Sequence, residues 1–333
     1  MSLDPELLPS GWWPAAVNDG HAYRDRVQAP LASTAAFYAE RYRHSGRTVW
    51  CERLAAGEIW CNGRQLRADG PLAAGDRLVW HRPPWQEPAV PVLPPASIVF
   101  DDGDLLVLNK PSGLPVLPAG GFLAHTLLRQ LEGWCAEQRL EASAGVPRPV
   151  HRLGRFTSGL LVCARRSATR AWLSAQLRES TAAGLDDRAL AGACRKVYRA
   201  ITEPLSADWL PGESRRITTP IGRQPHPRLG LIWAAAAPEA AGLACLSVLT
   251  LLERRPQSCR VEVAIATGRP HQIRIHCAAI GAPLLGDPLY LAGGAARASA
   301  LPGDGGYRLH ARALTLARAD GSPLQLLVEP PPD

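Results

Sequence analysis

The sequence predicts an α+β protein built on a largely antiparallel sheet. Apolar runs come in pairs around turn residues, as in SIVFDDGDLLVLNKPSG, where an Asp-Gly turn separates two strand patterns. Two further pairs occupy 243–267 and 307–329. Stretches with helical spacing lie between the pairs, and alternating strand–helix–strand units are absent. This arrangement favours hairpins with intervening helices over a parallel α/β fold.

A proline-rich stretch marks the domain boundary. PPWQEPAVPVLPPA, residues 83–96, holds six prolines among fourteen residues. Proline removes a backbone donor and fixes φ, so we expect a stiff extended linker. It separates a small α+β module at 20–82 from a larger domain at 97–331.

The remaining elements follow from local patterns. In the small module, residues 29–44 have helical spacing, and 57–82 is typical of short strands with Asn-Gly, Asp-Gly and Gly-Asp turns. In the large domain, helices are predicted at 125–138, at 167–180 and at 271–281, the last ended by Gly281. KVYRAIT, residues 196–202, predicts a further strand.

Charge and cysteine usage narrow the class of protein. The net charge is +7, and it arises after residue 89, because residues 1–89 contain ten arginines and ten acids. This excess favours a polyanionic partner. The eight cysteines show no CxxC pair and no metal-ligand spacing, which favours core thiols in a reducing cytoplasm over a metal site. The longest apolar stretch, 240–252, is too short to span a bilayer, and the acidic N-terminus is unlike a signal peptide, so we expect a cytoplasmic protein without a membrane segment.

Polar chemistry is concentrated in four places. Lys110 ends a strand pattern before Pro-Ser-Gly, and Tyr198 lies between cations in RKVYRA. The other two are PVHRLGRFTSGLL at 149–161 and ATGRPHQIRIH at 266–276. None is decisive alone, since a Thr-Gly-Arg turn before a helix could simply bind phosphate. The sequence contains no Ser-His-Asp, HExxH, P-loop or GxGxxG pattern, which argues against hydrolase, zincin and nucleotide-dependent chemistry.

Taken together and in order, these segments resemble the RluA-type pseudouridine synthases. The resemblance covers about residues 97–331 and rests on LLVLNKPSGLPV, VHRLGRFTSGLLVCAR, KVYRAI, PIGR and above all TGRPHQIRIHCAAIGAPLLGDPLY. The N-terminal module, with ERLAAGEIWCNG and LAAGDRL, resembles more weakly an S-four-like RNA-binding domain, named after the ribosomal protein.

The resemblance implies an isomerase that converts uridine in ribosomal or transfer RNA to pseudouridine, without a metal or nucleotide cofactor, and that acts as a monomer. The target uridine must leave its stack, which costs a few kcal/mol. Tyr198 matches the family's stacking tyrosine, and Arg274 matches the arginine that pairs with the catalytic aspartate. The residues expected to contact RNA are Lys110, His151, Arg152, Arg155, Arg269 and His271.

One position departs from the family pattern. The family motif reads His-Arg-Leu-Asp, and its aspartate is the essential catalytic acid, whereas this chain has Gly154 there. The second acidic position of the motif is Phe156. Arg274 would then be left without its partner. The candidates to replace the missing acid from elsewhere in the chain are Asp101, Asp102, Asp104 and Asp287. A hairpin turn explains the first three, and the family motif also contains Asp287, in a structural role.

Three hypotheses follow from this departure. In the first, the protein is an active pseudouridine synthase that replaces the missing acid with another residue, water or an RNA group. Alternatively, it is a catalytically inactive RNA-binding protein of the same fold. The third possibility is a cleft for another small polar ligand. Loss of a nucleophile or general acid usually costs many orders of magnitude in rate, which weighs against the first, while the intact TGRPHQIR stretch favours continued RNA recognition.

Tryptophan is concentrated near the N-terminus. Six of the ten tryptophans lie in residues 1–85: Trp12, Trp13, Trp50, Trp60, Trp80 and Trp85. Tryptophan interleaved with arginine suits stacking on single-stranded RNA. Core packing explains Trp60 and Trp80 equally well, because both lie on strand patterns.

Overall fold

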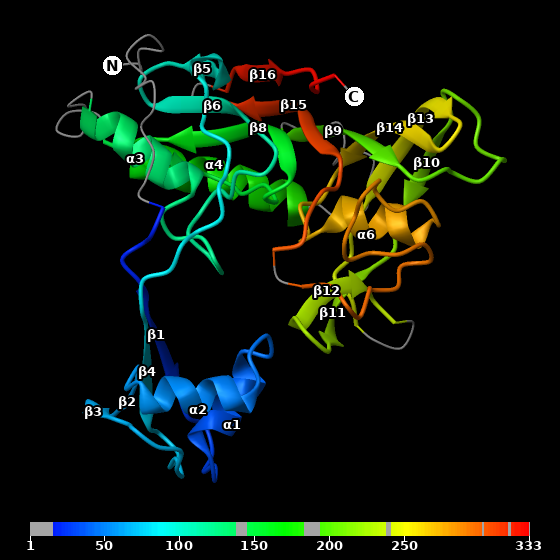
Figure 1. The fold of residues 1–333 in the computed structure, drawn as a ribbon. Coiled ribbons are helices and arrows are strands. Elements are labelled where there is room, and N and C mark those ends of the chain that lie inside the picture. Colours follow the sequence, from blue (N-terminus) through cyan, green and yellow to red (C-terminus); the bar gives the residue numbers. More distant parts are fainter. Residues whose placement is uncertain are drawn as a thin grey trace.

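The structure is a computed structural model that describes residues 16–137, 145–182, 194–237, 241–301, 303–318 and 321–332. A small N-terminal module lies below a larger body that contains a long sheet (Figure 1). None of the described helices is both long and apolar enough to cross a membrane.

The N-terminal module is a four-stranded sheet with two helices. Its elements are β1 (His21–Arg26), α1 (Thr34–Arg41), α2 (Arg47–Ala55), β2 (Ile59–Cys61), β3 (Arg64–Gln65) and β4 (Arg77–Arg82), with strand order β1-β4-β2-β3. The helix expected within 29–44 and the short strands within 57–82 are confirmed. The sequence analysis missed β1 and α2. In α2 only Trp50 and Leu54 are buried, so its helical pattern is short and weak.

Aromatic packing forms the core of this module. Tyr38 stacks on Trp50 with ring centroids 4.7 Å apart, and Trp80 meets Trp50 edge-on at 4.8 Å. Trp50 and Trp80 are buried, and the guanidinium of Arg53 lies over both rings. These two tryptophans therefore serve core packing, not RNA stacking, because their faces are already covered.

The large domain contains one long, mixed sheet. Its strands are β5 (Ile98–Asp101), β6 (Leu105–Lys110), β7 (Arg148–Pro149), β8 (Thr157–Ala164), β9 (Arg195–Thr202), β10 (Ser214–Ile217), β13 (Ser247–Arg255), β14 (Ser258–Ile265), β15 (Leu309–Ala317) and β16 (Pro323–Leu327). The main order is β10-β13-β14-β9-β15-β8-β6-β5, while β16 pairs with β15 and β7 with β8. The three predicted hairpins, β5–β6, β13–β14 and β15–β16, are confirmed.

One strand pair in this sheet is parallel, and it lies at the centre. β15 runs parallel to β8, with Leu309 opposite Thr157 and Ala311 opposite Gly159. A Cβ on Gly159 would lie 2.3 Å from the Ala311 carbonyl oxygen, and Gly159 has φ of 99°, so this position requires glycine. The pairing brings together the segments that precede the two strands, which are far apart in the chain.

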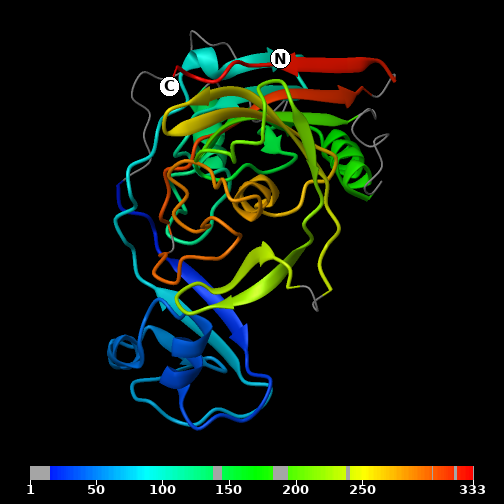
Figure 2. The same ribbon diagram turned by 90° about the vertical axis from the view of Figure 1, so that its right-hand side faces the viewer.

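The helices lie beneath the sheet. They are α3 (Leu127–Glu137), α4 (Ser167–Ala182) and α6 (Gln272–Ala279), and the short η2 (Pro95–Ser97) precedes β5. All three longer helices were predicted, and Gly281 follows α6 with φ of 86°, as expected. The views in Figures 1 and 2 place α6 between the main sheet and the separate hairpin of β11 (Ile221–His226) and β12 (Gly230–Ala235). One core lies around β6, β8 and α3, and a second lies around β13, β14 and α6.

The proline-rich segment is extended but docked. Val90 and Leu93 are buried in the core of the large domain, and Glu87 is 3% exposed. The Glu87 carboxylate accepts hydrogen bonds from the backbone N–H groups of Leu123, Ala124 and His125 and from the Asn18 side chain. Although desolvation opposes ionisation, these donors lower the pKa of Glu87. The sequence analysis expected a linker separate from both domains, whereas this segment packs against the large domain.

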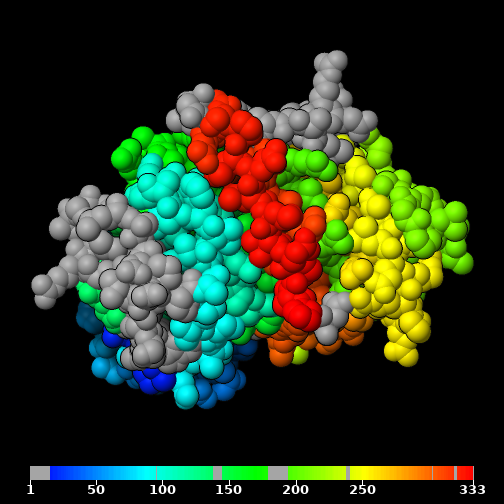
Figure 3. Space-filling view, turned by 90° about the horizontal axis from the view of Figure 1, so that it is seen from above, coloured from blue at the N-terminus to red at the C-terminus, as the bar shows by residue number. Residues whose placement is uncertain are grey.

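Two peripheral features complete the fold. Seen from above, the C-terminal segment lies between the β5–β6 region and the β13–β14 region (Figure 3).

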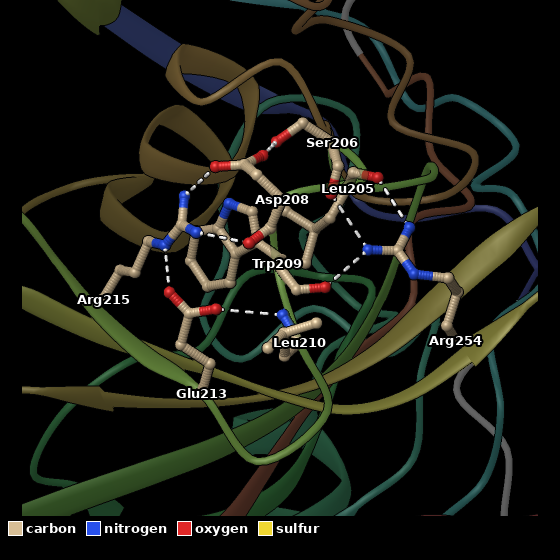
Figure 4. Close-up of polar contacts among 8 residues, drawn as sticks. All are labelled: Leu205, Ser206, Asp208, Trp209, Leu210, Glu213, Arg215 and Arg254. Atoms are coloured by element: carbon tan, nitrogen blue, oxygen red, sulfur yellow. Dashed lines mark hydrogen bonds and ion pairs between the residues drawn. The ribbon is translucent and has the colours of Figure 1, made fainter.

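At the sheet edge, Arg254 donates to the carbonyls of Leu205, Ser206 and Trp209, while Arg215 binds Asp208 and Glu213 (Figure 4). These arginines hold the β9–β10 connection onto the outer strands.

Candidate active site

A pocket of about 700 Å³ opens between α4, α6 and the middle strands of the sheet. Its lining comes from the segment before β8, from β9, from the end of β14, from the first turn of α6 and from Tyr307 just before β15. The cationic lining residues are Arg152, Arg178, Lys196, Arg269 and Arg274. Within the described part of the chain, no carboxylate lines this pocket. Its electrostatics therefore suit a polyanion.

Tyr198 lies on β9 in the pocket wall. Its strand neighbours are Val263 on β14 and Ala311 on β15. Desolvation by burial raises the pKa of Tyr198 to about 12, so the phenol stays neutral. A neutral ring in a cationic pocket can stack on a base, worth roughly 1–3 kcal/mol.

Arg274 lies on the first turn of α6 and has a carboxylate partner. Its Nε and one terminal nitrogen each donate to an Asp287 oxygen at 2.7 Å, and the Asp287 side chain is 1% exposed. Asp287 also accepts from the backbone N–H groups of Leu289 and Tyr290. The expectation that Arg274 would be unpaired is wrong, because the Asp287 carboxylate binds its guanidinium through two hydrogen bonds. Asp287 lies behind Arg274 and outside the pocket lining, consistent with its expected structural role.

His271 precedes α6 at the pocket mouth. It has φ of 55°, and its Nδ1 lies 2.7 Å from the Tyr290 hydroxyl, which itself donates to the Trp233 carbonyl. His271 therefore donates from Nδ1 and leaves Nε2 as an acceptor. Although His271 as a whole residue is exposed, desolvation of its ring and then the Arg274 charge lower the pKa of His271 to about 4, so the ring is neutral at physiological pH.

The position of the missing aspartate is filled from another segment. A Cβ on Gly154 would lie 2.3 Å from the Tyr307 hydroxyl oxygen and 3.3 Å from Thr157 Oγ1. Tyr307 Oη is 3.3 Å from Thr157 Oγ1, and the Arg274 guanidinium lies over the Tyr307 ring at 4.4 Å. Gly154, Thr157, Arg274 and Tyr307 thus meet at one point of the pocket.

The other expected RNA contacts divide into two groups. His151, Arg152 and Arg269 line the pocket with His271. His151 is neutral, because burial and then the Lys196 charge lower its pKa to about 4, and its Nε2 accepts from the Val162 N–H at 3.1 Å. Arg152 is exposed, whereas Arg269 is half-buried and donates to the Ala244 carbonyl.

Lys110 and Arg155 lie outside the pocket. Lys110 is fully buried, and its Nζ donates to the carbonyls of Pro111, Leu114 and Arg155 at 2.8–3.0 Å. Desolvation, with the Arg155 charge, lowers the pKa of Lys110 to about 7. Arg155 donates to the Gly113 carbonyl and lies over the Phe122 and Phe156 rings. Lys110 cannot reach a phosphate, so its expected RNA role is wrong. Arg155 stabilises the turn before β8 and lies outside the pocket.

The alternative acids Asp101, Asp102 and Asp104 serve the β5–β6 turn. Asp101 binds buried Arg165 through both oxygens, at 2.8 and 2.9 Å. Asp102 accepts from backbone N–H groups of its own turn, and Asp104 accepts from the Arg166 N–H and the Thr169 hydroxyl. The turn interpretation is confirmed. Among the described residues, no group of three or more His, Cys, Asp or Glu could hold a metal ion.

Sequence reasoning missed three pocket residues with titratable side chains: Arg178, Lys196 and Tyr307. Arg178 lies on the exposed side of α4, and only its place beside the pocket sets it apart from other arginines. Lys196, one of two lysines in the chain, offered a weak signal. Tyr307 offered none, because the parallel β8–β15 pairing that brings it to Gly154 cannot be recognised from local patterns.

Comparisons with known proteins agree with this geometry. A family model described as RNA pseudouridylate synthase matches residues 104–279. An uncharacterized RNA pseudouridine synthase of Synechocystis sp. is 43% identical over 82% of this chain and 85% of its own length. RNA pseudouridine synthase 5 of Arabidopsis thaliana is 36% identical over 95% and 93%. The ribosomal large subunit pseudouridine synthase D of Neisseria meningitidis is 33% identical over 75% and 60%.

A solved structure supports the fold. Human RNA pseudouridylate synthase domain containing 1 superposes with a TM-score of 0.51 and 23% identity, covering 74% of this chain and 87% of the human one. The matched family model spans β6 to α6 and so includes Gly154, Tyr198 and Arg274. The chain therefore belongs to the RluA-type RNA pseudouridine synthases, the isomerases that convert uridine in RNA to pseudouridine.

Proposed function

We propose that this protein isomerises a uridine in structured ribosomal RNA, and that it does so without a carboxylate at position 154. The observation that carries the proposal is the pocket, which combines five cations with the neutral ring of Tyr198. Its volume of about 700 Å³ suits a single extruded nucleoside. The Neisseria relative, named for the large ribosomal subunit, supports this RNA class.

Each part of the pocket has a role in this reaction. The exposed guanidiniums of Arg152 and Arg178 bind phosphates that flank the target. Tyr198 stacks on the extruded base, and neutral His271 offers Nε2 to a donor on the nucleoside. Arg274, held by Asp287, supplies fixed positive charge next to the reacting sugar. Isomerisation is redox-neutral and transfers no group to or from a second substrate, so we infer that no metal or nucleotide cofactor takes part.

We further propose that the protein works as a monomer in the cytoplasm. The free and mostly buried cysteines suit a reducing compartment. Light scattering on the purified chain, alone and with RNA, tests the oligomeric state; a stable dimer would contradict it.

Tritium release from unmodified ribosomal RNA labelled at uridine C5 tests the reaction itself. We expect release by the native protein, none by Arg274→Ala, and native-like release by Arg228→Ala, which removes an exposed arginine outside the pocket. Transfer RNA labelled in the same way tests the substrate class, and preferential release from it would overturn the ribosomal assignment.

The absence of a carboxylate among the described pocket residues favours a second candidate, RNA binding without turnover. Filter binding on the same RNA separates the two. Tight binding that requires Arg152 and Arg178, with no tritium release, would establish the binding protein and exclude the enzyme.

A further inference from the structure

Tyr307 occupies the place that the family reserves for its aspartate. Its hydroxyl oxygen lies 2.3 Å from the point where a side chain at position 154 would begin. Tyr307 is 6% exposed and lines the pocket together with Gly154 and Thr157. The hydroxyl therefore lies where the carboxylate of the family motif starts, in the same pocket and beside the same arginine.

The segment around Tyr307 is built to hold this position. The parallel register places Leu309 opposite Thr157, so Tyr307, two residues earlier, lies beside the 154–155 turn. The Phe156 ring meets the Tyr307 ring edge-on at 6.0 Å. A Cβ on Gly305 would overlap the Phe156 ring, so glycine at 305 lets the loop approach. The two acidic positions of the motif, 154 and 156, thus both pack against this one loop.

The neighbours of the hydroxyl favour a reactive role. Thr157 Oγ1, 3.3 Å away, can accept a hydrogen bond from the Tyr307 hydroxyl or donate one to it. The Arg274 guanidinium lies over the ring at 4.4 Å, so a positive charge lies next to the reacting oxygen. Asp287 fixes that guanidinium through two hydrogen bonds, so its charge stays in place.

We propose that Tyr307 is the nucleophile of this enzyme, in place of the missing aspartate; this rests on the proposed uridine isomerisation. Tyrosine forms covalent intermediates in enzymes and serves as nucleophile at the anomeric carbon in sialidases. Here the phenolic oxygen attacks C1′ of the extruded uridine. The O–C1′ bond forms as the C1′–N1 bond breaks, the electron pair of that bond goes to N1, and N1 takes the phenolic proton.

The second half returns the enzyme to its starting state. The detached uracil turns in the pocket until C5 faces C1′. C5 then attacks C1′, the O–C1′ bond breaks with its electron pair returning to the Tyr307 oxygen, and that oxygen takes the C5 proton. The product has a C1′–C5 bond and a proton on N1, which is pseudouridine, and no further acid, base or cofactor is consumed.

Single-turnover tritium release separates this role from a structural one. We expect Tyr307→Phe, which removes only the hydroxyl, to slow release by at least about 100-fold, with unchanged RNA affinity and melting temperature. Tyr38→Phe is the matched control, because it removes a buried hydroxyl without a hydrogen-bond partner among the described residues, in the N-terminal core. It should release tritium at the native rate.

A second variant tests the exchange between positions 154 and 307. Gly154→Asp alone is obstructed by the Tyr307 hydroxyl, but its Cβ lies 3.6 Å from the ring carbon Cζ, an ordinary contact once that hydroxyl is gone. We expect Gly154→Asp with Tyr307→Phe to recover at least about tenfold over Tyr307→Phe, since a carboxylate then reaches the Arg274 site.

The outcomes are distinct. Native-rate release by Tyr307→Phe overturns the nucleophile assignment and leaves the proposed function standing. No release by the native protein overturns the proposed function and this inference together, and release by the double variant alone would then show that Tyr307 blocks an otherwise competent site.

Discussion

The residues around Arg274 satisfy its charge although the motif aspartate is missing. Asp287 binds the guanidinium from behind, and the Tyr307 ring covers it from the pocket side. An arginine with neither contact would carry the full cost of a buried, unpaired charge. The loss of the motif aspartate is thus tolerated structurally, because both the charge and the volume of its site are supplied by other residues.

Lys110 was expected to contact RNA, but its buried side chain stabilises the fold instead. Its Nζ donates to three backbone carbonyl oxygens, those of Pro111, Leu114 and Arg155. We expect Lys110→Met to lower the free energy of unfolding by about 3 kcal/mol, because those carbonyls lose their donor.

Urea denaturation measures this change in stability. RNA filter binding at urea concentrations below the midpoint measures whether the folded variant keeps its RNA affinity. Arg152→Met should do the reverse, weakening RNA binding with unchanged stability. A loss of RNA affinity in folded Lys110→Met would contradict the structural role.

At the scale of elements, the site depends on the parallel contact of β8 and β15. This pair joins the two cores and sets the register that brings Tyr307 to Gly154. Gly159 permits it, because the Ala311 backbone passes where any side chain would be.

Gly159→Ala should therefore be severe. The methyl group would collide with a carbonyl at 2.3 Å and also force a left-handed conformation on alanine. We expect a loss of at least about 2 kcal/mol in the free energy of unfolding. Thermal and urea melts measure it, with Gly121→Ala as control, since a Cβ there meets nothing within 4 Å. Equal stability of the two variants would contradict the requirement for glycine at position 159.

For the whole molecule, the buried histidines predict how stability depends on pH. Burial lowers the pKa of His276 to about 4, against 6.5 for the unfolded chain, and His151 shifts in the same direction. Below pH 6.5 the unfolded chain binds protons that the folded chain does not, so stability falls as the pH drops from 6.5 towards 4. Urea melts at pH 7 and pH 5 measure this fall. His276→Gln should reduce it, and an unchanged pH dependence in that variant would contradict the assignment.

The N-terminal module gives a second whole-molecule prediction. Its tryptophans at 50 and 80 are internal, whereas arginines such as Arg64 and Arg77 are exposed and can contact phosphates. Replacing both with glutamine should reduce the slope of the salt dependence of RNA binding by roughly 0.7–0.9 for each phosphate that the module no longer neutralises. Titrations between 50 and 200 mM salt measure it. An unchanged slope would assign these arginines to solvent or to a protein partner.

Local chemistry in the sequence was enough to predict most elements. Paired apolar runs around turns indicated the hairpins, and amphipathic spacing indicated α3, α4 and α6, because both signals act over a few residues. The ordered motifs also identified the family and placed Tyr198, Arg274 and His271 in the site.

Only the tertiary structure decided which polar residues meet. Lys110 and Arg155 have motif positions that suggest RNA contacts, yet burial against backbone carbonyls directs one inward and aromatic packing holds the other. Tyr307 reaches Gly154 from a distant part of the chain through a parallel strand pair, and Asp287 reaches Arg274 through a loop that folds back on α6. The sequence by itself determined the family, most of the elements and the lost carboxylate. What replaces that carboxylate depends on long-range strand register, which no local pattern encodes.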